Sequence, residues 1–274
     1  MVDALSHPAY RLLRPVTAYA SVLLADNASP MTLDGTNTWV LRVPGSSRCV
    51  VVDPGPEDEV HLRRVAGHGP VDQVLLTHGH PDHAAGARRF AELVRAPVHA
   101  VEPRHRLGSA GLAEGDVVAA AGLEIRVLAT PGHTTDSLCF LIDGDGSGVG
   151  ASAVLTGDTV LGRGSTVIAH PDGKLGDYLA SLRRFAELPP GVSVLPGHGP
   201  DLPDAGQAAR AYLAHREQRL DQVRAARAAL WAQRGGEPDA RQIVEIVYSD
   251  VDRVLWPAAD ASVAAQLEYL RGQV

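Results

Sequence analysis

Four side chains that can bind a metal ion fall within six consecutive positions of the chain. After the apolar run 71–76, the sequence reads Thr77-His78-Gly79-His80-Pro81-Asp82-His83. Side chains alternate along an extended segment, so His78 and His80 point the same way. Asp82 and His83 fall at the start of a predicted helix, where two adjacent residues can face the same cavity. Imidazole and carboxylate together suit Zn²⁺ and, less exclusively, Mn²⁺ or Fe²⁺.

Three later segments have the same form, a strand that ends in turn residues and a potential metal ligand. They end at His133, Asp158 and His198. Glycine or proline beside each ligand sets a tight loop at a sheet edge. One such segment alone would be an ordinary turn, but together with the His-rich segment they predict a metal centre built from four strand ends. The two cysteines, Cys49 and Cys139, lie in apolar runs, which excludes a disulfide scaffold or a Cys-rich metal site.

Short β-rich segments dominate the first two hundred residues. Several of these segments follow one another without a helix between them, which fits a doubly wound parallel sheet poorly. Two mixed sheets packed together with helices outside fit better, so we predict an α/β sandwich. The patterns of apolar and turn residues predict strands at 18–24, 37–43, 48–52, 71–77, 98–101, 123–129, 138–142, 154–156 and 192–195, and helices at 57–66, 84–94 and 177–188.

After Pro203 the composition changes to that of a helical segment. A long helix is predicted at 205–233, followed by short helices at 240–248, 251–256 and 258–270. The apolar stripe of the long helix is Leu213, Leu220, Val223 and Leu230, and its arginines are read as a solvated face. We therefore predict a catalytic domain at 1–203 and a small all-helical domain at 204–274 that covers the cleft.

Composition and hydropathy give no support to several classes of partner. The 274 residues include 25 basic and 32 acidic ones, giving a formal charge of −7, which gives no support to binding duplex DNA through its phosphates. No apolar run approaches the length of a membrane span. The first residues lack a basic segment followed by an apolar one, so no secretory signal is visible. We expect a cytoplasmic protein without a membrane partner.

The metal-ligand pattern between residues 18 and 200 resembles that of the metallo-β-lactamase superfamily. The resemblance implies an αββα sandwich with a two-metal site at one edge, containing two Zn²⁺ ions. Asp53, in Val51-Val52-Asp53-Pro54-Gly55, matches a family position behind the metals, where it either orients a ligand or caps a turn. The implied ligands are His78, His80 and His133 for one ion, Asp82, His83 and His198 for the other, and Asp158 as the bridge.

A closer resemblance runs through nearly the whole chain. The motifs that carry it begin at Gly35, Leu161, Pro196 and Tyr212, and read Gly-Thr-Asn-Thr-Trp, Leu-Gly-Arg-Gly-Ser-Thr, Pro-Gly-His-Gly-Pro and Tyr-Leu-Ala-His-Arg. They are similar to those of the β-lactamase-like protein 2 subgroup, which adds a C-terminal winged-helix-like domain. That resemblance implies hydrolysis of phosphodiesters in single-stranded RNA, with a metal-bridging hydroxide as nucleophile. Asp82 is the candidate for taking the nucleophile's proton as well as binding metal.

The sequence leaves several other functions open. The same metals would serve a thioester hydrolase of the glyoxalase II or polyketide-releasing type acting on a small molecule. A dioxygenase with a single iron would give no role to the second group of predicted ligands, Asp82, His83 and His198. A true β-lactamase is disfavoured because Asp158 stands where zinc β-lactamases tend to use cysteine. A non-catalytic binding protein with a vestigial site is disfavoured because all seven ligand positions are filled.

Substrate-facing residues are predicted from their places next to the metal ligands. Asn37 and Thr38 begin a strand expected to end near the metals, and His215 and Arg216 on the long helix can offer donors to a phosphate. An ordinary surface or loop role is an equally open reading of each. The loop after Asp158 adds three more candidates, Arg163, Ser165 and Thr166.

Overall fold

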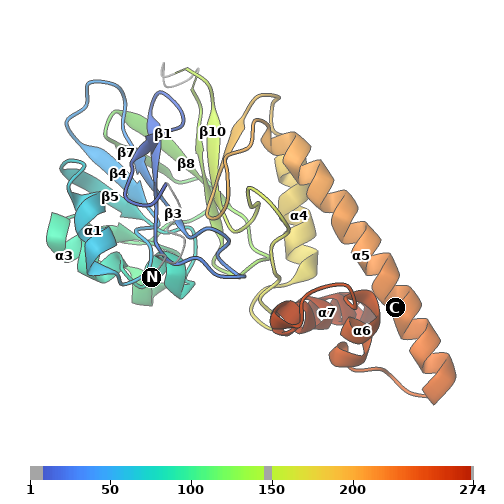
Figure 1. Ribbon diagram of the computed structural model, residues 1–274. Coiled ribbons are helices and arrows are strands. Elements are labelled where there is room, and N and C mark those ends of the chain that lie inside the picture. Colours follow the sequence, from blue (N-terminus) through green and yellow to red (C-terminus); the bar gives the residue numbers. More distant parts are fainter. Residues whose placement is uncertain (1–8, 145–149, 273–274) are drawn as a thin grey trace.

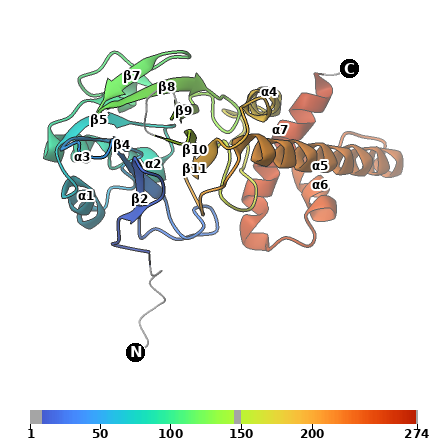
Figure 2. The ribbon, with the colours of Figure 1, turned by 90° about the horizontal axis from the view of Figure 1, so that it is seen from above.

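The computed structural model describes residues 9–144 and 150–272. Two β-sheets pack against each other with helices on their outer faces, and a long helix extends from one side of this sandwich (Figures 1 and 2). The predicted sandwich of two mixed sheets with a helical tail is confirmed. Within the described ranges, no helix combines the length and apolar character needed to span a membrane.

The first sheet has six strands in their order along the chain. Neighbouring strands are antiparallel from β1 to β4 and parallel from β4 to β6. The strands are β1 (Arg14–Pro15), β2 (Ala20–Leu24), β3 (Asn37–Leu41), β4 (Cys49–Val52), β5 (Val71–Leu75) and β6 (Val98–His99). Helices α1 (Glu59–Ala66), α2 (Pro81–Ala84) and α3 (Ala87–Val94) and the 3₁₀ turn η1 (Pro103–His105) belong to this half of the molecule.

The second sheet has five strands in the order β11-β10-β9-β8-β7. Its pairs are antiparallel except β10 with β11, which are parallel. The strands are β7 (Val117–Ala120), β8 (Leu123–Ala129), β9 (Leu138–Ile142), β10 (Ala153–Gly157) and β11 (Ser193–Pro196), and helix α4 (Leu175–Ala186) lies outside them.

Side chains alternate in direction along each strand. The apolar side chains are therefore divided between the layer between the two sheets and the layers under the outer helices. Val50 and Val52 of β4 face the second sheet, whereas Val51 between them packs under α1 and α3. On β8, Leu123 and Ile125 are buried in the same central layer. Both sheets are therefore fixed in register, because a slip of one residue would exchange the two faces.

Several predicted boundaries are wrong for identifiable reasons. The strand predicted at 71–77 ends at Leu75, and the N–H of Thr77 donates to a carboxylate instead. The helix predicted at 84–94 is two helices, because Gly86 turns against Gly55, where a Cβ would come within 2.9 Å of a backbone oxygen. Strand β7 was not predicted; it is the edge strand of the second sheet, and its Val117 is half exposed.

The tail consists of α5 (Ala205–Arg234), α6 (Ala240–Val247), the 3₁₀ turn η2 (Arg253–Leu255) and α7 (Trp256–Arg271). The predicted helix at 251–256 is thus only a 3₁₀ turn, and the last helix begins at Trp256, with Pro257 in its first turn. No strand occurs between residues 205 and 272, so the described tail is helical and has no β-wing. Leu220, Val223 and Leu230 of the predicted apolar stripe are buried, and Leu213 is partly buried.

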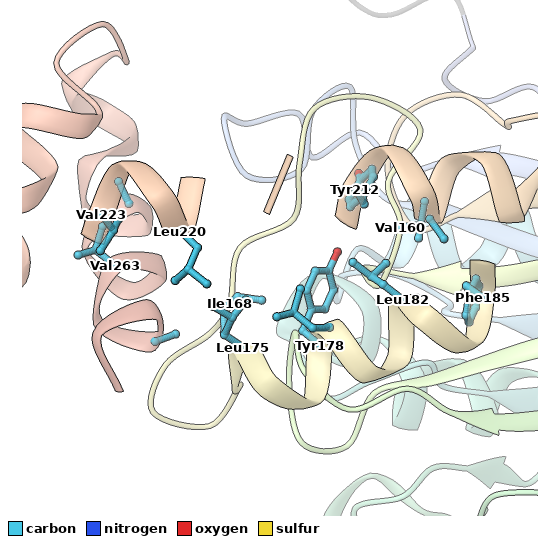
Figure 3. Packing of buried hydrophobic residues seen from close by; sticks show 14 of the residues in the cluster. Val160, Ile168, Leu175, Tyr178, Leu182, Phe185, Tyr212, Leu220, Val223 and Val263 are labelled. Carbon is cyan, nitrogen blue, oxygen red and sulfur yellow. The ribbon is translucent and has the colours of Figure 1, made fainter. Parts of the chain in front are cut away.

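The tail shares a hydrophobic core with the sandwich. One cluster of buried side chains runs from Leu182 on α4 through Tyr212 and Val223 on α5 to Val263 on α7 (Figure 3). The carboxylate of Asp204 caps α5 by accepting the N–H of Gln207 at 2.7 Å. The core therefore continues across the predicted boundary at 203/204.

This shared core predicts a large effect of truncating Leu182, which is fully buried. Leu182→Ala should lower the free energy of unfolding by about 2–5 kcal/mol, because it leaves a cavity between α4 and α5. Leu12→Ala is the matched control, since Leu12 is 63% exposed. Urea unfolding at equal metal content measures both variants, and equal midpoints would contradict the packing described.

Candidate metal centre

The His-rich segment reaches the centre because a strand gives way to a helix within a few residues. β5 ends at Leu75, and α2 begins at Pro81, whose missing N–H costs nothing at the first helical position. The N–H groups of His83 and Ala84 both donate to the backbone oxygen of His80, which closes the turn. His78 and His83 are buried as a result, whereas Asp82 keeps 27% of its side chain exposed.

All seven predicted ligands come together at one end of the sandwich, in two groups. Within each group, one potential ligand atom from every residue lies within 4.8 Å of the others. His133 follows β8, Asp158 follows β10 and His198 follows β11, so the strand ends converge as their sequence pattern predicts. The groups are His78, His80, His133 and Asp158, and Asp82, His83 and His198.

Hydrogen bonds fix the orientation of the imidazole rings. The Nδ1–H of His133 donates to the backbone oxygen of Val167 at 2.6 Å, and that of His198 donates to the oxygen of Gly35 at 3.0 Å. The Nδ1–H of His83 donates to a carboxylate oxygen of Asp53 at 2.9 Å. With Nδ1–H bound to these acceptors, each Nε2 points toward the centre, where it can bind a metal ion once it has lost its proton.

Close approaches between ring nitrogens show that this donor set fits a cation. His80 Nδ1 lies 3.0 Å from Nε2 of both His78 and His133, and the Nε2 atoms of His83 and His198 are 3.3 Å apart. These approaches gather several ring nitrogens in one small space. Such an arrangement, with two carboxylates beside it, suits a divalent metal ion.

The carboxylates are ionised despite their surroundings. Burial acts to raise the pKa of the Asp158 carboxyl, but His198 and His83 outweigh it and hold that pKa well below its usual value. At Asp82 the effect of burial is likewise outweighed by His83 and His198, so its pKa is lowered. Burial acts to lower the pKa of His198, but Asp158 and Asp82 raise it to about 9. A metal ion must therefore displace protons from this centre to bind.

Asp53 both caps a turn and orients a ring. Its backbone has a φ of +51°, and one carboxylate oxygen accepts the N–H of Thr77 at 2.8 Å. The other oxygen accepts the Thr77 hydroxyl at 2.6 Å and the His83 ring N–H at 2.9 Å. Sequence reasoning named Asp53 but missed Thr77 as its partner, although Thr77 precedes the His-rich segment directly.

Gly197 belongs to the tight loop that the sequence predicts beside His198. A Cβ at this position would lie 2.7 Å from a carboxylate oxygen of Asp158 and 2.7 Å from a ring carbon of His83. Even the smallest side chain would therefore push apart two of the ligand residues. The glycine in the Pro-Gly-His segment is required by close approach.

Asn37 and Thr38 lie behind the centre and do not line its cleft. The Asn37 amide donates to the backbone oxygens of Pro196 at 3.0 Å and Gly199 at 2.9 Å, on either side of His198. The Thr38 hydroxyl donates to the backbone oxygen of Asp53 at 2.8 Å. Both side chains are buried and position the segments that carry Asp53 and His198.

A cleft of about 300 Å³ opens beside the first ligand group. His133 and Asp158 lie on one side of it, with the predicted residues Arg163, Ser165 and Thr166 in the adjoining loop. Arg163 forms a two-point ion pair with Asp34, at 2.5 and 2.8 Å. The remaining walls come largely from the tail, where the lining residues include His215, Arg216, Arg219, Tyr248, Val251, Leu255, Ala258, Ala259 and Ser262.

The fold and the ligand pattern define a metallo-β-lactamase sandwich, and comparison with known proteins agrees. A sequence model of the metallo-beta-lactamase superfamily matches residues 31–198. The chain belongs to this superfamily, whose members are generally hydrolases. The His/Asp cluster within that fold suggests a divalent metal.

Three similar proteins extend the comparison. A beta-lactamase-like protein 2 homolog of Drosophila melanogaster is 30% identical over 269 residues, covering 90% of this chain and 86% of the relative. An atrochrysone carboxyl ACP thioesterase of Aspergillus fumigatus is 33% identical over 211 residues, covering 73% and 62%. The crystal structure of a beta-lactamase domain protein from Burkholderia ambifaria has a TM-score of 0.76 and 27% identity, covering 98% of this chain and 91% of that chain.

The hydrogen bonds of Asp53 predict its effect on metal binding. Asp53→Ala should weaken metal affinity by about 10- to 100-fold, because His83 loses the acceptor that sets its tautomer and orientation. Competition with a chromophoric chelator measures the affinity. Asp177→Ala, at an exposed position in the first turn of α4, is the control and should match wild type. Unchanged affinity in Asp53→Ala would show that the ring needs no such support.

Proposed function

We propose that this protein is a binuclear zinc hydrolase that cleaves a small acyl thioester. The seven His and Asp ligands would hold two Zn²⁺ ions, and the convergent ring nitrogens and ionised carboxylates support that assignment. When bound, two such ions supply a water nucleophile at neutral pH and stabilise negative charge on the carbonyl oxygen. Hydrolysis adds the oxygen of water to the acyl carbon and breaks the C–S bond, giving a carboxylic acid and a thiol.

Asp82 is the residue we propose to take the proton of the attacking water. Its carboxylate is ionised and, at 27% exposure, more open to solvent than that of Asp158 at 11%. The hydroxyl of Thr36 donates to Asp82 at 3.1 Å and holds the carboxylate in place. A positioned, ionised carboxylate beside the water can act as a general base.

The apolar wall of the cleft is the observation that supports a small acyl thioester as the substrate. Leu161 and Val167 from the sandwich and Val251, Leu255 and Ala258 from the tail line the space next to His133 and Asp158. A cleft of about 300 Å³ with apolar walls suits the acyl chain of a small molecule. The thioesterase named among the relatives supports the same choice.

The chemistry of the leaving group also favours a thioester as the substrate. Of the described residues that line the cleft, His215 is the one side chain outside the ligand groups that ordinarily titrates near neutral pH. Burial and the neighbouring Arg216 and Arg219 lower its pKa, so it is unprotonated at neutral pH and a poor proton donor. A thiolate leaves without such a donor far more easily than the alkoxide of an RNA phosphodiester.

Cleavage of single-stranded RNA is the second candidate. It rests on the sequence resemblance to the β-lactamase-like protein 2 subgroup, and the cationic side chains of α5 in the cleft are compatible with it. The same two metal ions would support hydrolysis of either a thioester or an RNA phosphodiester.

Turnover on four substrates tests the proposal: S-butyryl-N-acetylcysteamine, a single-stranded oligoribonucleotide, a lactone and a cephalosporin. With two zinc ions per chain, the thioester should be cleaved fastest. Asp158→Ala should lower that rate at least about a hundredfold, because the Asp158 carboxylate lies between the two ligand groups and would bind both ions, whereas Asp177→Ala should retain it.

Each of the other possible outcomes would indicate a different function. Preferred cleavage of the oligoribonucleotide would establish the second candidate instead. No turnover with two metals bound would favour a binding protein, and one iron per chain with dioxygenase activity would replace hydrolysis altogether.

A further inference from the structure

One face of α5 presents a guanidinium and an imidazole to the cleft. His215 and Arg219 are four residues apart, so they lie on the same side of the helix, and both line the cleft together with His133 and Asp158. Both side chains are partly buried. The helix therefore adds a positive charge and an imidazole ring to the lining of the cleft.

Arg219 is held in place by neutral groups. Its Nη1 donates to the backbone oxygen of Val247 at 3.1 Å and to the side-chain oxygen of Gln222 at 3.0 Å, and its guanidinium lies 4.8 Å from the centre of the Tyr248 ring. Within residues 9–144 and 150–272, no ion pair involves Arg219, whereas Arg227 on the same helix pairs with Glu237. Guanidinium has five N–H donors, so Arg219 retains several for a ligand.

Arg216 adds a buried positive charge behind the same wall. It is only 4% exposed, donates to the backbone oxygen of Thr166, and lies over the Tyr178 ring at 5.2 Å. Its Nε is buried without a hydrogen-bond partner among the described residues. A buried cation without a nearby carboxylate is costly unless an anion compensates it.

The surroundings of His215 agree with this excess of positive charge. Its Nδ1 is buried and has no hydrogen-bond partner in the described part of the chain. Burial, Arg216 and Arg219 all lower its pKa, and the described residues include no acidic group that acts in the opposite direction. Val251 and Leu255 also line the cleft, and apolar surroundings strengthen a charge interaction formed there.

We propose that Arg219 and His215, reinforced by Arg216, form a subsite for an anionic group of the substrate, a carboxylate or a phosphate remote from the scissile bond. This inference rests on the proposed hydrolase function, because it uses the same cleft. Apolar walls would take the chain between the scissile carbonyl and the anion, and α5 would fix the far end.

Two matched substrate pairs test the subsite and distinguish the sources of the anion. S-succinyl- and S-butyryl-N-acetylcysteamine differ in a carboxylate on the acyl side, and S-butyryl-4′-phosphopantetheine and S-butyryl-pantetheine differ in a phosphate on the thiol side. Wild type should prefer the anionic member of one pair by about 10- to 100-fold in kcat/KM. Arg219→Gln should remove most of that preference, and Arg219→Glu should reverse it.

Arg224→Gln is the matched control, because Arg224 lies on the same helix but pairs with Asp221 at 2.7 Å. It should keep both the activity and the preference of wild type. A preference that is absent from wild type in both pairs, or that survives in Arg219→Gln, would overturn the subsite.

A binding measurement keeps the inference separate from the proposed reaction. Two pairs of thioethers cannot be hydrolysed: S-(3-carboxypropyl)- and S-butyl-N-acetylcysteamine, and S-butyl-4′-phosphopantetheine and S-butyl-pantetheine. Calorimetry on the zinc-loaded protein should give about 10- to 100-fold tighter binding of the anionic member of one pair, lost in Arg219→Gln. Equal affinities within both pairs, or a gain that persists in Arg219→Gln, would overturn the subsite even if thioesters are cleaved, and the expected result would support it even if they are not.

Discussion

The carboxylate of Asp53 is the contact on which the arrangement of the centre depends. One side chain ties the end of β4 to Thr77 after β5 and to the His83 ring on α2. The backbone of Asp53 adopts a left-handed conformation to do so, which is uncommon for a residue other than glycine. Because three segments meet at one buried carboxylate, the His-rich segment cannot shift without breaking bonds that have no access to water.

The second constraint is the electrostatic balance of the centre. Ring nitrogens at 3.0 to 3.3 Å from one another, beside two ionised carboxylates, form an arrangement that protons or metal ions must neutralise. The backbone oxygens of Gly35 and Val167 fix which ring nitrogen faces inward, and Gly197 leaves the space for it. Rigid support of this kind comes from strand ends rather than from long loops, which is why each ligand follows a short turn.

Much of this was predictable because it is local. β8 and β9 were predicted with their observed bounds, and the candidate ligands that the fold brings together lie in strand-end motifs a few residues long. The rest depends on contacts distant in sequence. The amide of Asn37 is occupied by Pro196 and Gly199, some 160 residues away, and the break at Gly86 depends on Gly55. No periodicity in the chain encodes such partners.

The helical tail contributes both to the hydrophobic core and to the wall of the cleft. Its helices bury Val223 and Val263 in a core that includes Leu182 of the sandwich, so deleting the tail would expose that core and confuse loss of folding with loss of a cleft wall. The same helix α5 carries Arg216, which donates to Thr166, and the next residue, Val167, accepts the ring N–H of His133. The wall of the cleft and the candidate metal ligand His133 are thereby supported through one loop. Point substitutions at exposed faces of α5, rather than truncation, are the changes that can separate the two roles.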